Sequence, residues 1–274
     1  MLLLGCDFSS APTPRKPVVV ATGSLDGAGQ ALALGELHRF ATLDGWGQWL
    51  AEQPAWVGAF DFPFSLPREL VEHLGWPTAW PELIAHYATL ERAEIRRLFA
   101  AFCAARPVGG KFAHRATDAP AGSSPSMKWV NPPVAYMLHA GVPRLVAAGA
   151  AFPALQAPEA TAAARRVALE GYPGLLAREL IGRRSYKSDD KARQTEERRT
   201  ARAELAACLV RGETRLDIRL DASPAQVERL LDDATGDAID AVLCLVQAAW
   251  ASRRAPSFGL PPGIDRLEGW IVTA

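Results

Sequence analysis

Three apolar segments of strand length end in a carboxylate, and this feature constrains the fold more than any other. Leu2–Asp7 and Trp56–Asp61 each place an Asp after a run of apolar or small residues, and Arg166–Glu170 ends in a Glu. Burial of an ionised carboxylate is costly unless the group is paired or bound to a metal. Because the ends of neighbouring strands lie at one edge of a sheet, we expect the three acids to share a site.

A fourth acidic element is the helix expected from Gly236 to Trp250. Apolar or small residues occupy most of its circumference, which is typical of a buried helix. Asp237 and Asp240 lie on this helix, and no basic residue stands three or four positions from either of them. The helix dipole favours an acid in the first turn, which accounts for Asp237 but not for Asp240. We therefore expect a group outside the helix to balance their charge.

Each acid also has an ordinary explanation when it is taken alone. Asp7 and Asp61 can accept hydrogen bonds from backbone amides in strand-end turns, for which Ser9, Ser10 and Ser65 provide a suitable setting. Taken together, the acids are better explained by Mg²⁺ or Mn²⁺, which prefer oxygen ligands and relieve the repulsion among carboxylates. The sequence therefore predicts a divalent-cation site, with Ser9 and Ser10 as candidate substrate contacts.

The pattern of the whole chain predicts a single α/β domain over residues 1–274. The first sixty residues indicate an antiparallel meander, then a short helix and a strand that crosses back into the sheet. Residues from about 66 to 165 are expected to form a mostly helical insertion with a loop at 107–131, and Ser223 begins a helix with a capping box. The expected strands are 2–7, 18–22, 31–40, 56–61 and 166–170; the expected helices include 44–53, 133–149 and 174–182, and most of the chain from there to residue 270 is also expected to be helical.

The charge of the chain disfavours a protein that holds nucleic acid through bulk positive charge. The 30 Lys and Arg residues cancel the 30 Asp and Glu residues. Residues 162–203 nevertheless hold eleven basic and six acidic residues, so a DNA or RNA backbone would be attracted to a local basic patch there. A solvated helix face is the alternative for 189–203, because acids alternate with the arginines. The basic residues of this patch are Arg165, Arg166, Arg183, Arg184, Lys187, Lys191 and Arg193.

The cysteines and the hydropathy pattern bear on the cellular compartment. The four cysteines have neither zinc-ligand spacing nor the pattern of a disulfide framework, which fits a reducing environment. No segment has the length and apolar character of a membrane span. We expect a cytoplasmic protein with no membrane contact, and an oligomer remains open.

A long loop carries a second group of candidate substrate-binding residues, Lys111, His114, Arg115 and Asp118. Arg115, oriented by Asp118, is suited to bidentate contact with phosphate. An ion pair internal to the loop is an equally good interpretation.

Tyr186 and Lys187 are two further candidate substrate-binding residues, because they follow two arginines in the most basic segment. Lys187 can contact a phosphate and Tyr186 can stack on a base. Packing of Tyr186 in the core is the alternative.

The acidic elements and their surroundings resemble a known family. An apolar first strand that ends in Asp, a meander, a later strand that ends in an acid and a helix beginning Asp-Ala-x-Asp-Ala are similar to the ribonuclease H-like nucleases, especially the RuvC-like resolvases. The ordered set resembles more closely the family called domain of unknown function 429, which is described as predicted nucleases of ribonuclease H-like fold. The motifs are Asp7 to Pro12, Phe60 to Pro67, His114 to Asp118, Glu170 to Pro173, Tyr186-Lys187 and Asp237 to Ala241.

The resemblance implies a role for each acid and a fold for the chain. Asp7 would be the central ligand that bridges the metals, Asp61 a second ligand, and Asp240, with Asp237, would close the site from the helix. Glu170 would be an outer ligand that also counts among the catalytic residues. The implied fold is ribonuclease H-like, with a mixed five-stranded sheet flanked by helices. The middle acid is Asp where resolvases have Glu, and the insertion is larger than a compact resolvase needs.

The sequence therefore predicts a Mg²⁺- or Mn²⁺-dependent nuclease that hydrolyses a phosphodiester bond. One alternative is a metal-dependent hydrolase or phosphotransferase that acts on a small phosphorylated molecule. A non-catalytic binding module of the same fold is another.

Overall fold

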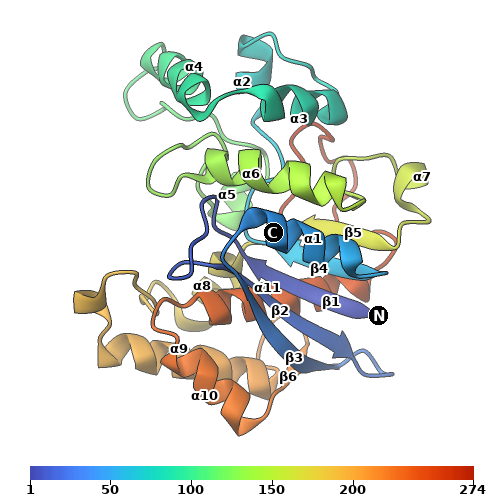
Figure 1. Ribbon diagram of the computed structural model, residues 1–274, viewed down its shortest axis with the longest axis vertical. Helices are drawn as coiled ribbons and strands as arrows, with labels where there is room; N and C mark the ends of the chain where they lie inside the picture. The colour runs from blue at the N-terminus through green and yellow to red at the C-terminus, as the bar shows by residue number, and fades with distance from the viewer.

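The computed structural model describes residues 1–274 as an α/β fold built on one six-stranded mixed sheet. The strand order is β5-β4-β1-β2-β3-β6, and helices cover both faces (Figure 1). The strands are β1 (Leu2–Asp7), β2 (Val18–Leu25), β3 (Ala31–Phe40), β4 (Trp56–Phe60), β5 (Arg166–Glu170) and β6 (Arg219–Asp221).

The pairing of the strands confirms the predicted meander and the crossover. Strands β1, β2 and β3 pair antiparallel, whereas β4 pairs parallel to β1 and β5 parallel to β4. This arrangement is consistent with ribonuclease H-like topology. The prediction of five strands was wrong, because β6 adds a sixth at the edge of β3. Only three residues of β6 pair with β3, so the strand is too short to show a period of two in the sequence.

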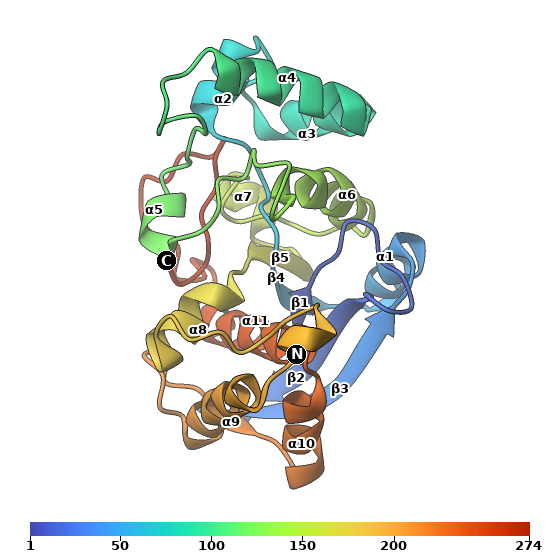
Figure 2. The same ribbon diagram turned by 90° about the vertical axis from the view of Figure 1, so that its left-hand side faces the viewer.

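Alternation along the strands sends side chains to two separate hydrophobic cores. On β1, Leu3 lies in the core beneath helices α8 (Pro173–Ile181), α9 (Glu196–Arg211) and α11 (Asp237–Ser252). Leu4 and Cys6 lie in the core shared with α1 (Leu43–Glu52), α3 (Trp80–Thr89), α4 (Arg92–Ala104) and α6 (Val134–Ala147). Both cores are continuous, which accounts for the near-complete burial of β1 and β4. Figures 1 and 2 show α8 to α11 on one face of the sheet and α1 with α6 on the other.

The helices lie close to their predicted positions in the first two thirds of the chain. The prediction of 44–53 corresponds to α1, that of 133–149 to α6 and that of 174–182 to α8. The longer helices are α1 (Leu43–Glu52), α3 (Trp80–Thr89), α4 (Arg92–Ala104), α6 (Val134–Ala147), α8 (Pro173–Ile181), α9 (Glu196–Arg211), α10 (Pro224–Asp232) and α11 (Asp237–Ser252). The shorter ones are α2 (Arg68–His73), α5 (Asp118–Ala121), α7 (Pro158–Thr161) and the 3₁₀ helix Lys191–Arg193.

Helices α2 to α7 lie between β4 and β5 in the sequence, and α2, α3 and α4 form the upper part of the molecule in Figure 1. The Ser223 capping box at the start of α10 is confirmed.

The predicted helical structure does not continue to residue 270. Residues 253–274 are mainly turns, and Ile271 forms an isolated parallel bridge with Glu170. Three prolines and three glycines after residue 255 explain why no helix forms there.

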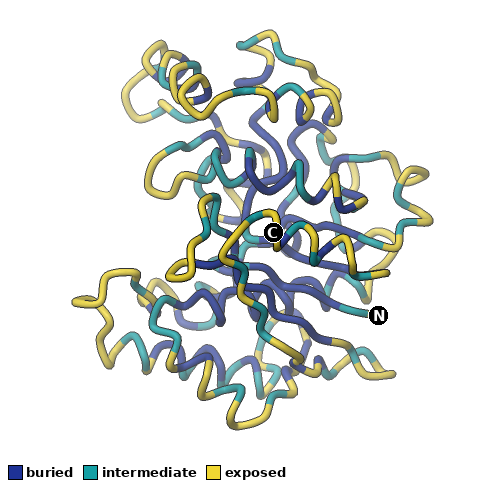
Figure 3. Tube along the Cα trace, viewed as in Figure 1, coloured by how far each residue is buried: buried dark blue, intermediate teal, exposed yellow.

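Buried chain runs through the centre of the molecule and exposed chain lies at its periphery (Figure 3). Helix α11 is the most completely buried helix, with only its last turn partly exposed. No helix combines the length and the apolar character needed to cross a lipid bilayer.

Candidate functional site

Asp7 and Asp61 lie side by side because of the register of two parallel strands. Cys6 of β1 pairs with Phe60 of β4, so the next residue on each strand is an aspartate. The backbone amide of Asp61 donates to the carbonyl of Cys6 at 2.8 Å, which holds the two strand ends together. Figure 2 views the molecule from the side at which these strands end.

Asp240 reaches the same place from helix α11, which crosses β1 at Gly5. A Cβ atom built on Gly5 would lie well under 3.0 Å from the backbone of Ala241 and Leu245. Only a glycine therefore allows the helix to approach this closely. The approach brings the first turn of α11, with Asp240, to the end of β1.

The three carboxylates form one cluster. Asp7, Asp61 and Asp240 each offer an oxygen, and these oxygens lie within 4.8 Å of one another. Asp240 is fully buried, whereas Asp7 and Asp61 are partly exposed. The three predicted central residues therefore do come together, and their oxygen donors match those that Mg²⁺ and Mn²⁺ prefer.

The electrostatic state of the cluster reflects crowding of like charges in a buried place. Burial and then the Asp240 carboxylate raise the pKa of Asp7 well above its usual value. The same causes, in the same order, raise the pKa of Asp61 to about 7. A divalent cation would relieve this repulsion, because it stabilises the ionised form of both groups.

Tyr186 and Lys187 supply the group outside the helix that balances Asp240. The Tyr186 hydroxyl donates to Oδ1 of Asp240 at 2.6 Å, and the Lys187 ammonium forms an ion pair with Oδ2. Burial alone would lower the pKa of Lys187, but the negative charges around it, of which Asp240 contributes most, together raise that pKa well above its usual value. Burial and Asp240 likewise raise the pKa of Tyr186, which keeps its hydroxyl protonated as a donor.

These contacts change the interpretation of the Tyr-Lys pair. Tyr186 is buried and is not available to stack on a base, whereas the side chain of Lys187 is 43% exposed and faces both the cluster and solvent. The sequence pointed to these residues but not to their partner, since they stand more than 50 positions from Asp240.

Asp237 lies next to the cluster without belonging to it. It is buried in the first turn of α11, and burial followed by the Asp233 carboxylate raises its pKa. The oxygens that meet within 4.8 Å come from the other three aspartates. Asp237 is therefore placed to influence the charge of the site rather than to complete the cluster.

Glu170 has a different role from the outer-ligand role that the resemblance implies. Both of its carboxylate oxygens accept from Arg115, at 2.6 and 2.8 Å, and one also accepts from the Phe64 amide. The side chain of Glu170 is almost fully buried and lies outside the aspartate cluster. Glu170 is therefore already neutralised by Arg115 and is not one of the acids whose oxygens meet in the cluster.

Arg115 and Asp118 likewise form an internal ion pair and not a phosphate clamp. The Arg115 guanidinium is 1% exposed, and it contacts the Asp118 carboxylate at 3.0 Å as well as Glu170. An arginine that is buried and bound to two carboxylates has no free face for a phosphate. The network attaches the 107–131 loop to the end of β5, so its role is to hold the loop in place.

The remaining candidate substrate contacts are accessible. Ser9 and Ser10 lie two and three positions after Asp7, are partly exposed, and their hydroxyls make no hydrogen bond within the protein. Lys111 and His114 are exposed in the loop and make no ion pair or side-chain hydrogen bond with the three aspartates. Contact of any of these four residues with a substrate stays a prediction.

The basic segment is divided in the structure. Arg165 and Arg166 stand at the start of β5, which pairs with the start of β4, and so they lie at the opposite end of the sheet from the aspartates. Arg184 is paired with Glu204 and Arg193 with Asp190. Arg183 and Lys191 are exposed and form no ion pair. The positive charge available to an anion is therefore smaller than the sequence suggests.

Arg202 is a positioning residue that the sequence did not reveal. It is 3% exposed on α9, and its guanidinium donates to the carbonyls of Tyr186 and Leu231 at 2.7 and 2.9 Å. It thereby fixes the backbone that carries the Tyr-Lys pair. The surrounding run of alternating Arg and Glu indicates a solvated face, and nothing in it distinguishes Arg202 from its neighbours.

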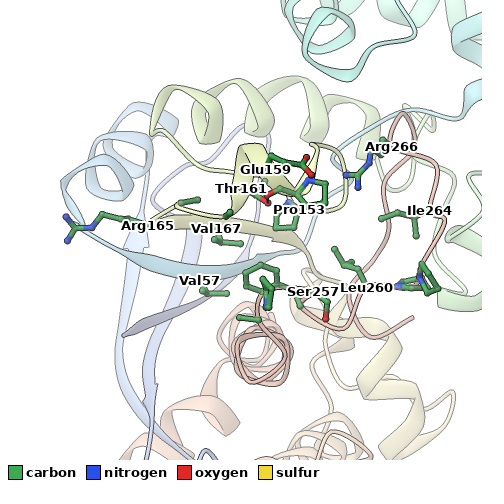
Figure 4. A pocket seen from close by; sticks show the side chains of 18 of the residues that line it. Val57, Pro153, Glu159, Thr161, Arg165, Val167, Ser257, Leu260, Ile264 and Arg266 are labelled. Atoms are coloured by element: carbon green, nitrogen blue, oxygen red, sulfur yellow. Dashed lines mark hydrogen bonds between the residues drawn. The ribbon is translucent and has the colours of Figure 1, made fainter.

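A cavity of about 820 Å³ lies at the other end of the strands and holds no acid cluster. Val57 of β4 and Val167 of β5 line it, together with Leu260 and Ile264 from the C-terminal segment (Figure 4). Its walls are mainly apolar, and Arg165 points away from it. The cavity therefore lacks a group of acids like the one at the opposite strand ends.

Comparisons with protein-family models, with curated proteins and with solved structures found no match. Membership in the family called domain of unknown function 429 stays a prediction from the motifs.

Proposed function

We propose that the protein is a Mg²⁺- or Mn²⁺-dependent nuclease of ribonuclease H-like fold that hydrolyses a phosphodiester bond. The observation that carries the proposal is the meeting of Asp7, Asp61 and Asp240 within 4.8 Å from two strands and a helix. A fold that gathers three acids, one of them fully buried, without an arginine among them sacrifices stability, which is typical of a functional site.

The donor set suits a hard divalent cation. Asp7 and Asp61 accept no side-chain hydrogen bond, so their oxygens are available as ligands. Mg²⁺ or Mn²⁺ bound there would place positive charge against a phosphodiester and produce a nucleophile from water at neutral pH. The strand ends hold both carboxylates in place, so little reorganisation is needed when substrate binds.

Side chains beside the cluster would position the substrate. The Lys187 side chain is partly exposed at the edge of the aspartates, and its ammonium could contact a phosphate oxygen. The hydroxyls of Ser9 and Ser10 are free to donate to the same group. The loop after β1 is connected to the segment that carries Lys187 through an ion pair between Lys16 and Asp189, so the two edges of the site are joined.

The divided basic segment favours a second candidate function, hydrolysis or transfer of phosphate on a small phosphorylated molecule. Arg184 and Arg193 are neutralised by acids, and only a few exposed cations of the segment, such as Arg183 and Lys191, remain unpaired. A small phosphoester needs fewer such contacts than a nucleic-acid backbone does.

Cleavage assays test the proposal directly. Labelled single- and double-stranded DNA and RNA, and a chromogenic phosphodiester, would be incubated with Mg²⁺, with Mn²⁺ or with a chelator. We expect cation-dependent cleavage of a nucleic acid, loss of nearly all of it in Asp7→Asn, and full activity in Asp221→Asn, an exposed acid on β6.

Equal rates in Asp7→Asn and in the unchanged protein would contradict the proposal. Hydrolysis of the chromogenic ester alone would favour the small-molecule function, and no hydrolysis of any of these substrates would favour a binding module.

A further inference from the structure

The three aspartates of the cluster are not equivalent. Both oxygens of Asp240 are already engaged, one by the Tyr186 hydroxyl at 2.6 Å and the other by the Lys187 ammonium. Asp7 and Asp61 have no such partner. Two carboxylates of the cluster are therefore open to a cation, and the third is committed to a positive charge that the protein itself supplies.

Neighbouring residues on α11 and α9 hold Lys187 in this position. Its stem crosses the start of α11 at Gly236, where a Cβ atom would lie 2.6 Å from Cβ of Lys187. Gly236 also has a φ of +80°, a conformation that other residues adopt with strain. Behind the lysine, Arg202 anchors the Tyr186 carbonyl. The lysine is thus directed at Asp240 from a fixed backbone.

The balance of charge points the same way. The three carboxylates carry a formal charge of minus three, and Lys187 offsets one unit of it. One divalent cation offsets the remainder. Two divalent cations beside Lys187 would bring five positive charges to three carboxylates, which like-charge repulsion in a partly buried place disfavours.

We propose that the site holds a single divalent cation between Asp7 and Asp61, and that the Lys187 ammonium on Asp240 serves as the second positive centre. This inference rests on the proposed function, but it concerns the number of cations and the role of one lysine. Lys187 would contact the phosphate on the side away from the cation, since its side chain is partly exposed to solvent.

Cation stoichiometry tests this without reference to activity. Mn²⁺ would be titrated into the full chain by calorimetry, and electron paramagnetic resonance would distinguish isolated ions from a coupled pair. We expect one Mn²⁺ per chain in the unchanged protein and in Lys187→Arg, and two in Lys187→Met, whose Asp240 carboxylate is freed. Lys191→Met, an exposed lysine without an ion pair, is the matched control and should bind one.

Two Mn²⁺ in the unchanged protein, or one in Lys187→Met, would overturn the inference while leaving a cation-dependent nuclease intact. No Mn²⁺ binding at all would overturn the proposed function as well. Circular dichroism establishes whether each variant is folded. If Lys187→Met does not fold, Lys187→Arg, which retains the positive charge, takes its place. Two Mn²⁺ bound to Lys187→Arg would then overturn the inference.

Discussion

The backbone of Gly5 on β1 lies directly against the backbone of Ala241 on α11, and no side chain fits between them. This contact sets the distance at which Asp240 stands from Asp7. The fold therefore depends at this point on a residue without a side chain, and so does the candidate site.

Substitution of Gly5 is expected to be severe. Gly5→Ala would push the helix from the sheet, because its Cβ meets backbone atoms that cannot rotate away. We expect a loss of about 3 kcal/mol or more in the free energy of unfolding, measured by urea denaturation. Gly27→Ala is the matched control, since a Cβ there meets nothing within 4 Å, and it should change stability by less than about 0.5 kcal/mol. Equal effects of the two would show that the contact is not tight.

Removal of one acid from the cluster should stabilise the cation-free protein. Asp7→Asn removes a carboxylate that lies beside the Asp240 carboxylate and has no hydrogen-bond partner of its own, so like-charge repulsion within the cluster falls. We expect the melting temperature in a chelator to rise, corresponding to about 0.5–2 kcal/mol. The same variant should lose the stabilisation that Mn²⁺ gives to the unchanged protein. A lower melting temperature in chelator would indicate that Asp7 has a structural role instead.

The raised pKa of Asp61 predicts how stability depends on pH. Its pKa is about 7 in the folded, cation-free protein and near 3.8 when unfolded, so the folded state holds the proton more tightly. The favourable contribution is complete below pH 3.8 and is lost as the pH rises through 7. In a chelator, we expect the free energy of unfolding to fall between about pH 4 and 7, and to fall less steeply in Asp61→Asn. Parallel curves for the two proteins would contradict this assignment.

The network around Arg115 should be needed for folding and not for substrate binding. Arg115→Met would leave the Asp118 and Glu170 carboxylates buried without their partner. We expect a loss of about 3–5 kcal/mol in the free energy of unfolding. Arg96→Met removes an exposed arginine that makes no ion pair, and should have little effect. A stable Arg115→Met protein with an increased KM would restore the phosphate-clamp interpretation.

The strands and the aspartates could be predicted from the sequence because their signals are local. An apolar run that ends in an acid identifies β1 and the strand end at Asp61, and the register of parallel strands brings Asp7 and Asp61 together. The acids of α11 have no basic partner on their own helix, so the sequence indicated that a positive charge from another segment lies beside them. Lys187 fills that requirement, although the sequence did not show where it would lie.

Other features depend on contacts that no local pattern encodes. Glu170 and Arg115 each matched a site motif, but they form a buried ion pair with one another although 55 positions separate them in the sequence. Arg202 looks like a surface residue in the sequence and is buried by the packing of α9 against its neighbours. Strand β6 exists because three residues reach the edge of β3, and its sequence alone does not require a strand.

Anomalous diffraction from crystals grown with Mn²⁺ shows directly whether a divalent cation binds to the aspartates. We expect an anomalous peak in contact with the carboxylates of Asp7 and Asp61, and its disappearance in Asp7→Asn. A protein that shows no peak at these residues in saturating Mn²⁺ would contradict the claim that the three aspartates gather to hold a divalent cation.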